Sequence, residues 1–295
     1  MEELRIKLKI LMEQKGYSQS SVANSLQVSS SALSQYLSGK YNGNVKKIDE
    51  DVKNFIDREA EKERQPLKKV EFIQTVNAKK VYDTARFCHL DGEIGVIYGD
   101  AGTGKTTAVK EYVKKHKDAI LIEADLGFST KILFKKLHDA LHLDGQGHIH
   151  DLFEGVVEKL KGSGRLIIID EAEHLPYRAL EMVRRINDFA EIGILLVGMP
   201  RLINNLRGER GNYAQLYSRI GMAVRLDALA QEDTIEIVKS LLPSANGVWK
   251  EFHRFSKGNT RVLVKMILRA KRLAQINNCG VNAEIVKSTF EMLIA

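Results

Sequence analysis

The chain has 295 residues, 44% of them hydrophobic, and a formal net charge of +7 at pH 7. This length exceeds the usual size of one domain, so we expect two or three domains. The two cysteines, Cys88 and Cys279, lie far apart in the sequence, which argues against a disulfide framework or a cysteine metal cluster. Because no apolar run approaches the roughly 18 residues of a membrane helix and the N-terminus lacks a secretion-signal pattern, we expect a cytoplasmic protein with no membrane partner.

The first 40 residues have the pattern of an all-α domain. The apolar spacing predicts helices over residues 4–15, 18–26 and 30–40, with a tight turn at 27–29. Ser18 and Ser29 stand where the second and third helices need N-terminal caps, and Ala23 is small enough for two helices to cross there. This order is typical of a helix-turn-helix, and it resembles that of lambda-repressor-like domains.

In that resemblance the third helix faces the major groove of DNA. The residues placed at the DNA are then Ser30, Ser31, Ser34 and Gln35, with Lys40, Lys46 and Lys47 near phosphates. Three lysines and no acid between residues 17 and 47 favour DNA, although a module that binds only protein is the alternative. Serine is a weak reader of base edges, so we expect binding that tolerates many sequences.

Residues 49–69 are densely charged, with few apolar positions beyond Val52, Phe55 and Ile56. Such a segment buries too little apolar area to offset the cost of ordering it, and Pro66 punctuates its end. We therefore expect a short helix that runs into a mobile linker, with a domain boundary near residue 65. The first domain would span residues 1–65.

The strongest motif in the chain is a phosphate-binding loop. The pattern G-x-x-x-x-G-K-[ST] is met at every fixed position by Gly99, Asp100, Ala101, Gly102, Thr103, Gly104, Lys105 and Thr106. A β-branched run precedes it at 94–98, and a helical pattern follows it from Thr107. Backbone N–H groups of this loop would wrap the polyphosphate of ATP, with Lys105 at its β and γ phosphates and the Thr106 hydroxyl on Mg²⁺.

A second acidic motif follows the aliphatic run at 166–169, which predicts a buried strand. Asp170 at the strand end would hold Mg²⁺ together with Thr106, while Glu171 would polarise the water that attacks the γ-phosphate. Glu173 and His174 come one step later and are interpreted as helix-start residues rather than metal ligands. The two motifs together predict an ATPase.

Further strand patterns occur at 119–124, 192–198 and 222–226, with helical patterns at 72–90 and 130–141. They predict an α/β core of parallel strands between helices over residues 66–229. Residues 230–295 are helical in pattern, over 234–242, 248–255, 259–275 and 283–293, and they predict a small lid domain. Parallel strands joined by helices are the usual architecture of a phosphate-loop enzyme.

The lid carries the surplus positive charge of the chain. Residues 248–275 contain eight Lys or Arg against one acid, Glu251. Arg261, Lys265, Arg269 and Arg272 are spaced by four, four and three residues, so they share one helix face. This stripe suits DNA or another polyanion, and a solvated helix face is the alternative.

The order of motifs resembles AAA+ ATPases, and the resemblance implies three further roles. It places an arginine finger that reaches a neighbouring subunit at Arg219, with Arg210 and Arg225 as competing choices, and a second sensor of the γ-phosphate at Arg261. It also implies a polar sensor at the end of the fourth strand, where this chain has Gly198 and Met199. Either Asn204 or Asn205 takes that role, or hydrolysis is slow.

Over essentially its whole length the chain resembles the transposition protein B family of phage Mu. The segments that carry this resemblance are Lys40–Gly43, Arg86–Phe87, Ile168–Ala172 and Leu216–Ile220. It implies an ATP-dependent homo-oligomeric filament on double-stranded DNA that delivers this target to a transposase, stimulates strand transfer and disassembles on hydrolysis, in a bacterial host cell. It also places Lys131, Lys135 or Lys136 at the DNA. An ATP-switched, sequence-specific transcription regulator and a helicase loader are the alternatives.

Overall fold

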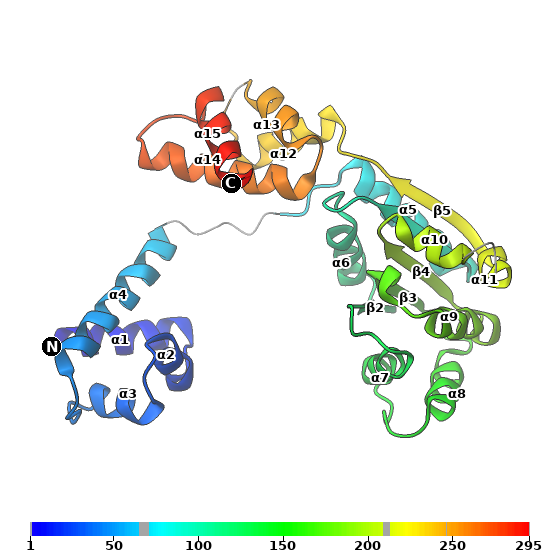
Figure 1. Cartoon of the computed structure of the whole chain (residues 1–295), viewed down its shortest axis with the longest axis horizontal. Helices are drawn as coiled ribbons and strands as arrows, with labels where there is room; N and C mark the ends of the chain where they lie inside the picture. The colour runs from blue at the N-terminus through cyan, green and yellow to red at the C-terminus, as the bar shows by residue number, and fades with distance from the viewer. Residues whose placement is uncertain (1, 65–70, 209–212, 246, 295) are drawn as a thin grey trace. The chain divides into compact units, whose positions relative to one another are not determined.

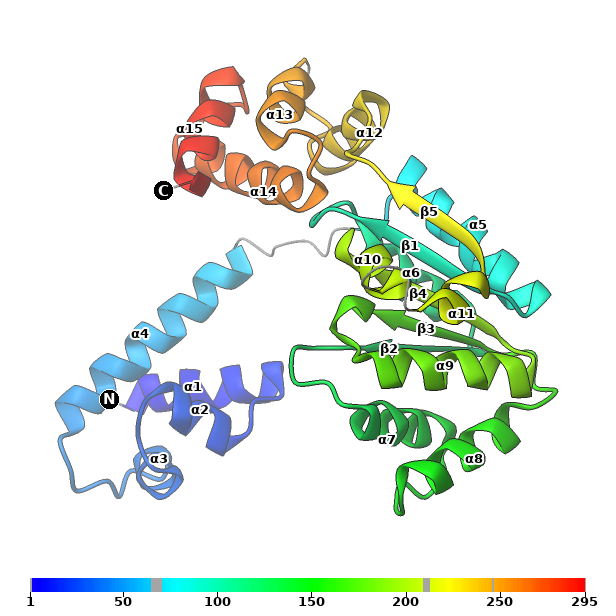
Figure 2. The same ribbon diagram turned by 45° about the vertical axis from the view of Figure 1, so that its right-hand side comes forward.

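The computed structural model describes residues 2–64, 71–208, 213–245 and 247–294 of the chain. The chain divides into two compact units, Met1–Val70 and Glu71–Ala295. Within the second unit, the sheet with its helices and the helical lid form one compact body (Figures 1 and 2). The domain division at residues 65/66 and 229/230 stays a prediction.

The first unit is helical over its described residues. Its helices are α1 (Glu2–Lys15), α2 (Gln19–Ser25), α3 (Ser30–Leu37) and α4 (Val45–Arg64). The Ser18 hydroxyl oxygen accepts the backbone N–H of Ser21, and that of Ser29 accepts the N–H of Ala32, so both serines are caps, as predicted. Ala23 is buried between the helices. That this unit is a DNA-binding helix-turn-helix stays a prediction.

The expectation of a short helix and a linker after residue 49 is wrong in one respect. Helix α4 is 20 residues long and continues through the charged segment to Arg64. Ile48, Val52 and Phe55 recur at helical spacing and are buried against the other three helices, while Glu59 accepts a hydrogen bond from the Tyr17 hydroxyl at 2.9 Å. One narrow apolar face therefore stabilises a helix whose remaining surface is charged.

A parallel five-stranded sheet forms the core of the second unit, in the order β2-β3-β4-β1-β5. The strands are β1 (Ile94–Gly99), β2 (Ala119–Glu123), β3 (Leu166–Asp170), β4 (Gly193–Gly198) and β5 (Ile220–Leu226). All five strand predictions are confirmed to within two residues at each end. Strands β3 and β4 are buried along their whole length, which explains their continuous aliphatic runs.

Helices cover both faces of this sheet (Figure 2). Alternate side chains of β3 point to opposite faces, so Ile168 packs with α5 and α6 while Ile167 packs with α7, α8 and α9. These helices are α5 (Val76–Asp91), α6 (Lys105–Lys115), α7 (Thr130–Leu141), α8 (Ile149–Leu160) and α9 (Tyr177–Ala190). The three short helices near the strand ends are η1 (Ala172–His174), α10 (Arg201–Arg207) and α11 (Ala214–Ser218).

The lid contains the four helices that the sequence predicts. They are α12 (Gln231–Leu241), α13 (Trp249–Ser256), α14 (Thr260–Ile276) and α15 (Ala283–Ile294), and they enclose their own apolar core around Phe252 and Met266. The Asn77 side chain donates to the carbonyl of Asp227 at 2.7 Å, and the Val76 N–H donates to Asp233 at 3.0 Å. These bonds join the start of α5 to the beginning of the lid. Among the described residues, no helix combines the length and the apolarity needed to span a membrane.

Candidate nucleotide site

The predicted phosphate loop lies between β1 and α6. Gly102 and Gly104 have φ angles of 83° and 93°, a left-handed conformation that a residue with a Cβ rarely adopts. At Gly99 a Cβ would lie 2.6 Å from the carbonyl oxygen of Leu226 on β5, so the loop can start here only with glycine. The backbone N–H groups at the N-terminus of α6 follow directly, which is a ready site for an anion.

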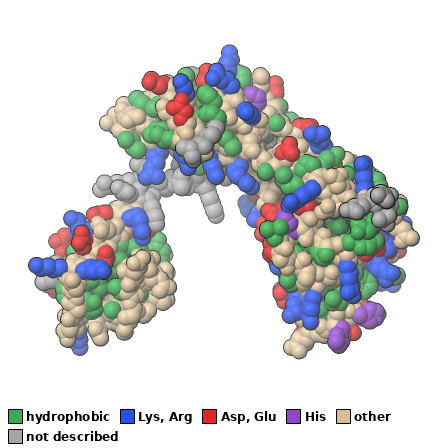
Figure 3. All heavy atoms as spheres, in the orientation of Figure 1, with side chains coloured by type: hydrophobic (Ala, Val, Ile, Leu, Met, Phe, Trp, Pro, Cys, Tyr) green, Lys and Arg blue, Asp and Glu red, His purple; other side chains and the backbone are tan. Residues whose placement is uncertain are grey.

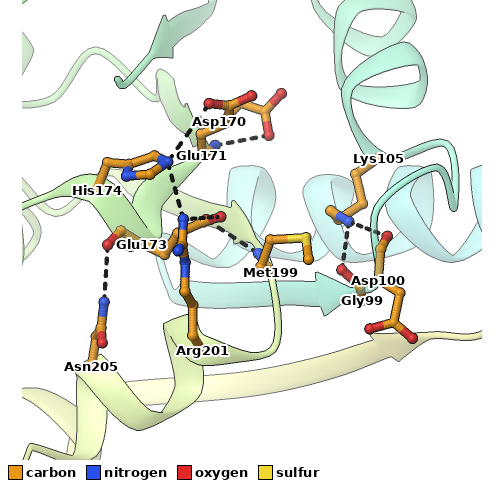
Figure 4. A network of polar contacts seen from close by, with 10 residues as sticks. All are labelled: Gly99, Asp100, Lys105, Asp170, Glu171, Glu173, His174, Met199, Arg201 and Asn205. Carbon is orange, nitrogen blue, oxygen red and sulfur yellow. Dashed lines mark hydrogen bonds and ion pairs between the residues drawn. The ribbon is translucent and has the colours of Figure 1, made fainter. Parts of the chain in front are cut away.

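Lys105 is the first residue of α6, and its ammonium group lies inside the loop (Figure 4). Its Nζ donates to the carbonyl oxygens of Gly99 at 2.6 Å and Asp100 at 2.8 Å. Burial lowers the pKa of Lys105, and the carboxylates of Asp170 and Glu173 oppose this effect. A buried cation inside a loop of this kind is suited to hold a polyphosphate.

Asp170 ends β3 and is almost fully buried. Its Oδ1 accepts the N–H of Glu171 at 2.9 Å, whereas its Oδ2 has no hydrogen-bond partner in the part of the chain that the structure describes. Burial raises the pKa of Asp170, and the nearby Thr106 hydroxyl partly offsets the rise. An unpartnered carboxylate oxygen close to a hydroxyl fits the oxygen ligands that Mg²⁺ prefers, and the ion would neutralise phosphate charge there.

Glu171 follows at once but has a different environment. Its side chain is 60% exposed, and its φ of 54° is in the left-handed region that non-glycine residues seldom occupy. This conformation begins η1 and gives the two adjacent acids different surroundings (Figure 4). One buried and one accessible carboxylate match the predicted division between a metal ligand and a base, and those roles stay predictions.

The end of β4 holds contacts that sequence reasoning missed. The carboxylate of Glu173, a residue of η1, is buried and accepts the N–H of Met199 at 3.1 Å. The Asn205 amide donates to the carbonyl oxygen of Glu173 at 2.9 Å, so it holds η1 in place, while Asn204 is exposed on α10. The Arg201 guanidinium contacts the same carboxylate although it is 28 residues away in the sequence. No local sequence pattern predicts such a contact.

The lid touches the phosphate loop through the start of α14. Asn259 caps this helix with its Oδ1 and donates from Nδ2 to the carbonyl of Ala101 at 2.8 Å, while the N–H of Thr260 donates to Gly102 at 2.8 Å. Arg261 comes next and contributes to lowering the pKa of Lys105, so it lies within electrostatic range of the loop. The sequence predicts Arg261 here, but the contact made by Asn259 was missed.

Residues 88–206, from the end of α5 to α10, match a family model described as an AAA domain. The chain contains an AAA ATPase domain. The fold prediction of a phosphate-loop core of this class is confirmed, as is the prediction of an ATPase.

Two curated relatives extend beyond the AAA domain. The Mu-like prophage FluMu DNA transposition protein B of Haemophilus influenzae is 28% identical over 79% of this chain and 83% of its own length. The ATP-dependent target DNA activator B of Escherichia phage Mu is 26% identical over 79% of this chain and 76% of its own length. The resemblance to the phage Mu transposition protein B is thus confirmed.

Among solved structures, the ORC2 protein of Aeropyrum pernix matches with a TM-score of 0.58 and 17% identity, over 74% of this chain and 68% of that one. At this identity the likeness shows the fold alone. It covers more of the chain than the AAA family model does.

Arg219 lies far from the phosphate loop of its own chain. It precedes Ile220, which pairs with Ile94 at the first residue of β1, whereas the loop leaves β1 at its other end. Five residues of strand separate the two ends by about 16 Å. Its Nε lies 3.5 Å from Asp188 on α9. Arg219 therefore does not reach the nucleotide site of its own chain.

Arg225 is the alternative candidate for the arginine finger that lies within the described residues. Arg225 pairs with Tyr98, one residue before the phosphate loop begins, so it lies near the nucleotide site of its own chain. It is exposed and forms an ion pair with Asp227 at 3.6 Å. Arg210 lies outside the described residues. The roles of Arg219 and Arg225 stay predictions.

The predicted DNA contacts are exposed but lie on separate elements. In the first unit, Ser30, Ser31, Ser34, Gln35 and Lys40 are exposed on α3 and directly after it. In the second unit, the exposed residues are Lys131 and Lys135 on α7 and Lys265 and Arg269 on α14. Acidic side chains are interspersed with the basic ones on the visible face of the lid (Figure 3), so the basic character follows α14 rather than the whole lid. Lys136 is engaged, since its Nζ donates to the Glu123 carbonyl at 3.1 Å.

Proposed function

We propose that this protein is an ATP-dependent, sequence-tolerant DNA-binding ATPase that prepares target DNA for a transposase in the cytoplasm of a bacterial host. The observation that carries the proposal is the match, over 79% of the chain, to proteins named as a DNA transposition protein B and an ATP-dependent target DNA activator B. The nucleotide site supports it, because Lys105, Thr106 and Asp170 supply the groups that ATP and Mg²⁺ require.

Within this proposal, subunits assemble as a homo-oligomeric filament on DNA. Arg219 supports assembly because it lies too far from the phosphate loop of its own chain and would serve the site of a neighbouring chain. A site that receives its arginine from a neighbouring chain hydrolyses ATP only when subunits assemble. ATP is then an assembly signal, and hydrolysis releases subunits from the DNA. In this scheme the filament delivers its DNA to the transposase and stimulates strand transfer, and release frees DNA that the transposase already occupies.

Electron microscopy of the protein with random-sequence duplex DNA tests the proposal. We expect filaments with a nonhydrolysable ATP analogue and none without nucleotide. Absence of oligomers on DNA with the analogue would exclude the proposed function. A single protected operator in footprinting would favour the transcription regulator instead, and capture of a replicative helicase would favour the loader.

Phosphate contacts make DNA binding sensitive to salt. If six phosphates are neutralised, affinity is expected to fall about a thousandfold between roughly 50 and 200 mM salt. Replacing Lys265 and Arg269 with Ala should weaken binding to all sequences and reduce the slope of log affinity against log salt by about two. Lys287→Ala, which removes an exposed lysine of α15 paired with Glu291, is the control and should leave the slope unchanged. An unchanged slope in the double variant would remove α14 from the interface.

Arg219→Ala tests completion of the site by a neighbouring chain. Because Arg219 cannot reach its own phosphate loop, the variant should bind ATP as the wild type does. Its DNA-stimulated ATPase should fall to the rate measured without DNA, since the transition-state charge is no longer neutralised in trans. Arg225→Ala is the comparison: loss of stimulation in that variant alone would transfer the role to Arg225.

A further inference from the structure

The end of β4 has no side chain that can sense a phosphate by hydrogen bonding. Gly198 has none, and the Met199 thioether is at best a weak acceptor. The space is filled instead, because a Cβ at Gly198 would lie 2.2 Å from Oε2 of Glu173. A carboxylate from η1 thus occupies the tip of the strand.

This carboxylate belongs to a continuous chain of polar contacts (Figure 4). Glu173 Oε2 accepts the Met199 N–H, and its Oε1 lies 3.5 Å from Nη2 of Arg201. The same Nη2 lies 3.1 Å from Nε2 of His174, and this nitrogen is 4.0 Å from Oε2 of Glu171. These contacts run from the end of β4 through Glu173, Arg201 and His174, and His174 is the member that approaches the accessible acid of the nucleotide site.

The chemistry of arginine decides the state of His174. A guanidinium has only donors, so in the 3.1 Å contact Nε2 of His174 must be the acceptor, with the ring proton on Nδ1. A neutral ring held in this way cannot donate from Nε2 to Glu171. The carboxylate of Glu171 then keeps its lone pairs for a water molecule, as a general base requires.

The network also lies within electrostatic range of the phosphate loop, since Glu173 acts on Lys105. Its members differ in exposure: the Glu173 side chain is 3% exposed and that of His174 15%, against 56% for Arg201. Glu173 is buried and His174 is half-buried, so packing restrains both, whereas the exposed Arg201 is the member with most freedom to move.

We propose that Arg201 is a positioning residue for ATP hydrolysis: it holds Nε2 of His174 as an acceptor and so keeps Glu171 free as a base, at a site where β4 ends without a polar side chain. The inference rests on Glu171 being that base but not on filament formation. It explains how the domain hydrolyses ATP with Met199 at this position.

Single-turnover hydrolysis and equilibrium ATP binding by the full chain test this role. Arg201→Ala should lower the rate constant about tenfold to a hundredfold, because Nε2 of His174 is then free to donate to Glu171 and to compete with the attacking water, while the Kd for ATP stays within about twofold. His174→Phe should keep the wild-type rate, and adding it to Arg201→Ala should restore that rate, because no imidazole is left to compete for Glu171. Arg185→Ala, at an exposed arginine of α9, is the matched control and should leave both quantities unchanged.

A double variant separates positioning from a direct contact with phosphate. If Arg201 acts through Glu171, adding Arg201→Ala to Glu171→Gln should cause no further loss of rate. A further loss of the same factor would overturn the proposal, as would a normal rate in Arg201→Ala alone. Each comparison is made with and without duplex DNA. Failure of the proposed DNA function would appear as missing stimulation of the wild type, and the DNA-free measurements would still report on Arg201.

Discussion

Lys105→Ala is expected to abolish ATP binding, and with it assembly on DNA. The Lys105 ammonium is buried inside the loop, where it donates to the carbonyl oxygens of Gly99 and Asp100. Beside a bound polyphosphate this charge would form hydrogen bonds to anionic oxygens, which contribute about 1.5–3 kcal/mol each. Loss of two of them weakens binding by at least about a hundredfold.

Titration of a fluorescent ATP analogue measures this effect. Lys110→Ala is the control, because Lys110 lies on the same helix but is exposed and pairs with Glu123 at 2.7 Å. It should bind the analogue normally. Thermal unfolding of both variants shows whether the loop still folds without its central cation. Affinity of Lys105→Ala close to that of the wild type would remove this loop from the nucleotide site.

Glu171→Gln is expected to keep ATP binding and to stop hydrolysis. The amide has nearly the same shape as the carboxylate but cannot accept the proton of the attacking water. Because the side chain is exposed, the exchange leaves no buried group unpaired. Removing a general base lowers the rate by about 10² to 10⁴. Filaments formed with ATP should then persist on DNA.

ATPase assays and the lifetime of filaments under the microscope give the two readouts. Glu158→Gln is the matched control, since Glu158 is also exposed but lies on α8, which contributes no residue to the nucleotide site. It should hydrolyse ATP at the wild-type rate. Rapid disassembly of filaments by Glu171→Gln with ATP would refute the assignment of Glu171 as the base.

Much of the fold could be predicted from the sequence because its signals are local. Each buried strand is a short aliphatic run, and the lid helices repeat their apolar residues at helical spacing. The length of α4 was missed because its buried face consists of only a few residues among many charges. These apolar residues are buried only because the other three helices of the unit pack against them, and the sequence of α4 does not show that packing.

The phosphate loop and the acids after β3 were determined by the sequence alone, because a backbone that wraps a phosphate demands glycine, lysine and threonine at fixed spacing. The tertiary structure decided which distant residues complete the site. The parallel register of β5 with β1 places Arg219 at the end of the strands opposite the loop, and packing brings Asn259 to the loop across 158 residues and Arg201 to Glu173 across 28. Such contacts arise when separate elements pack together, and spacing along the chain does not encode them.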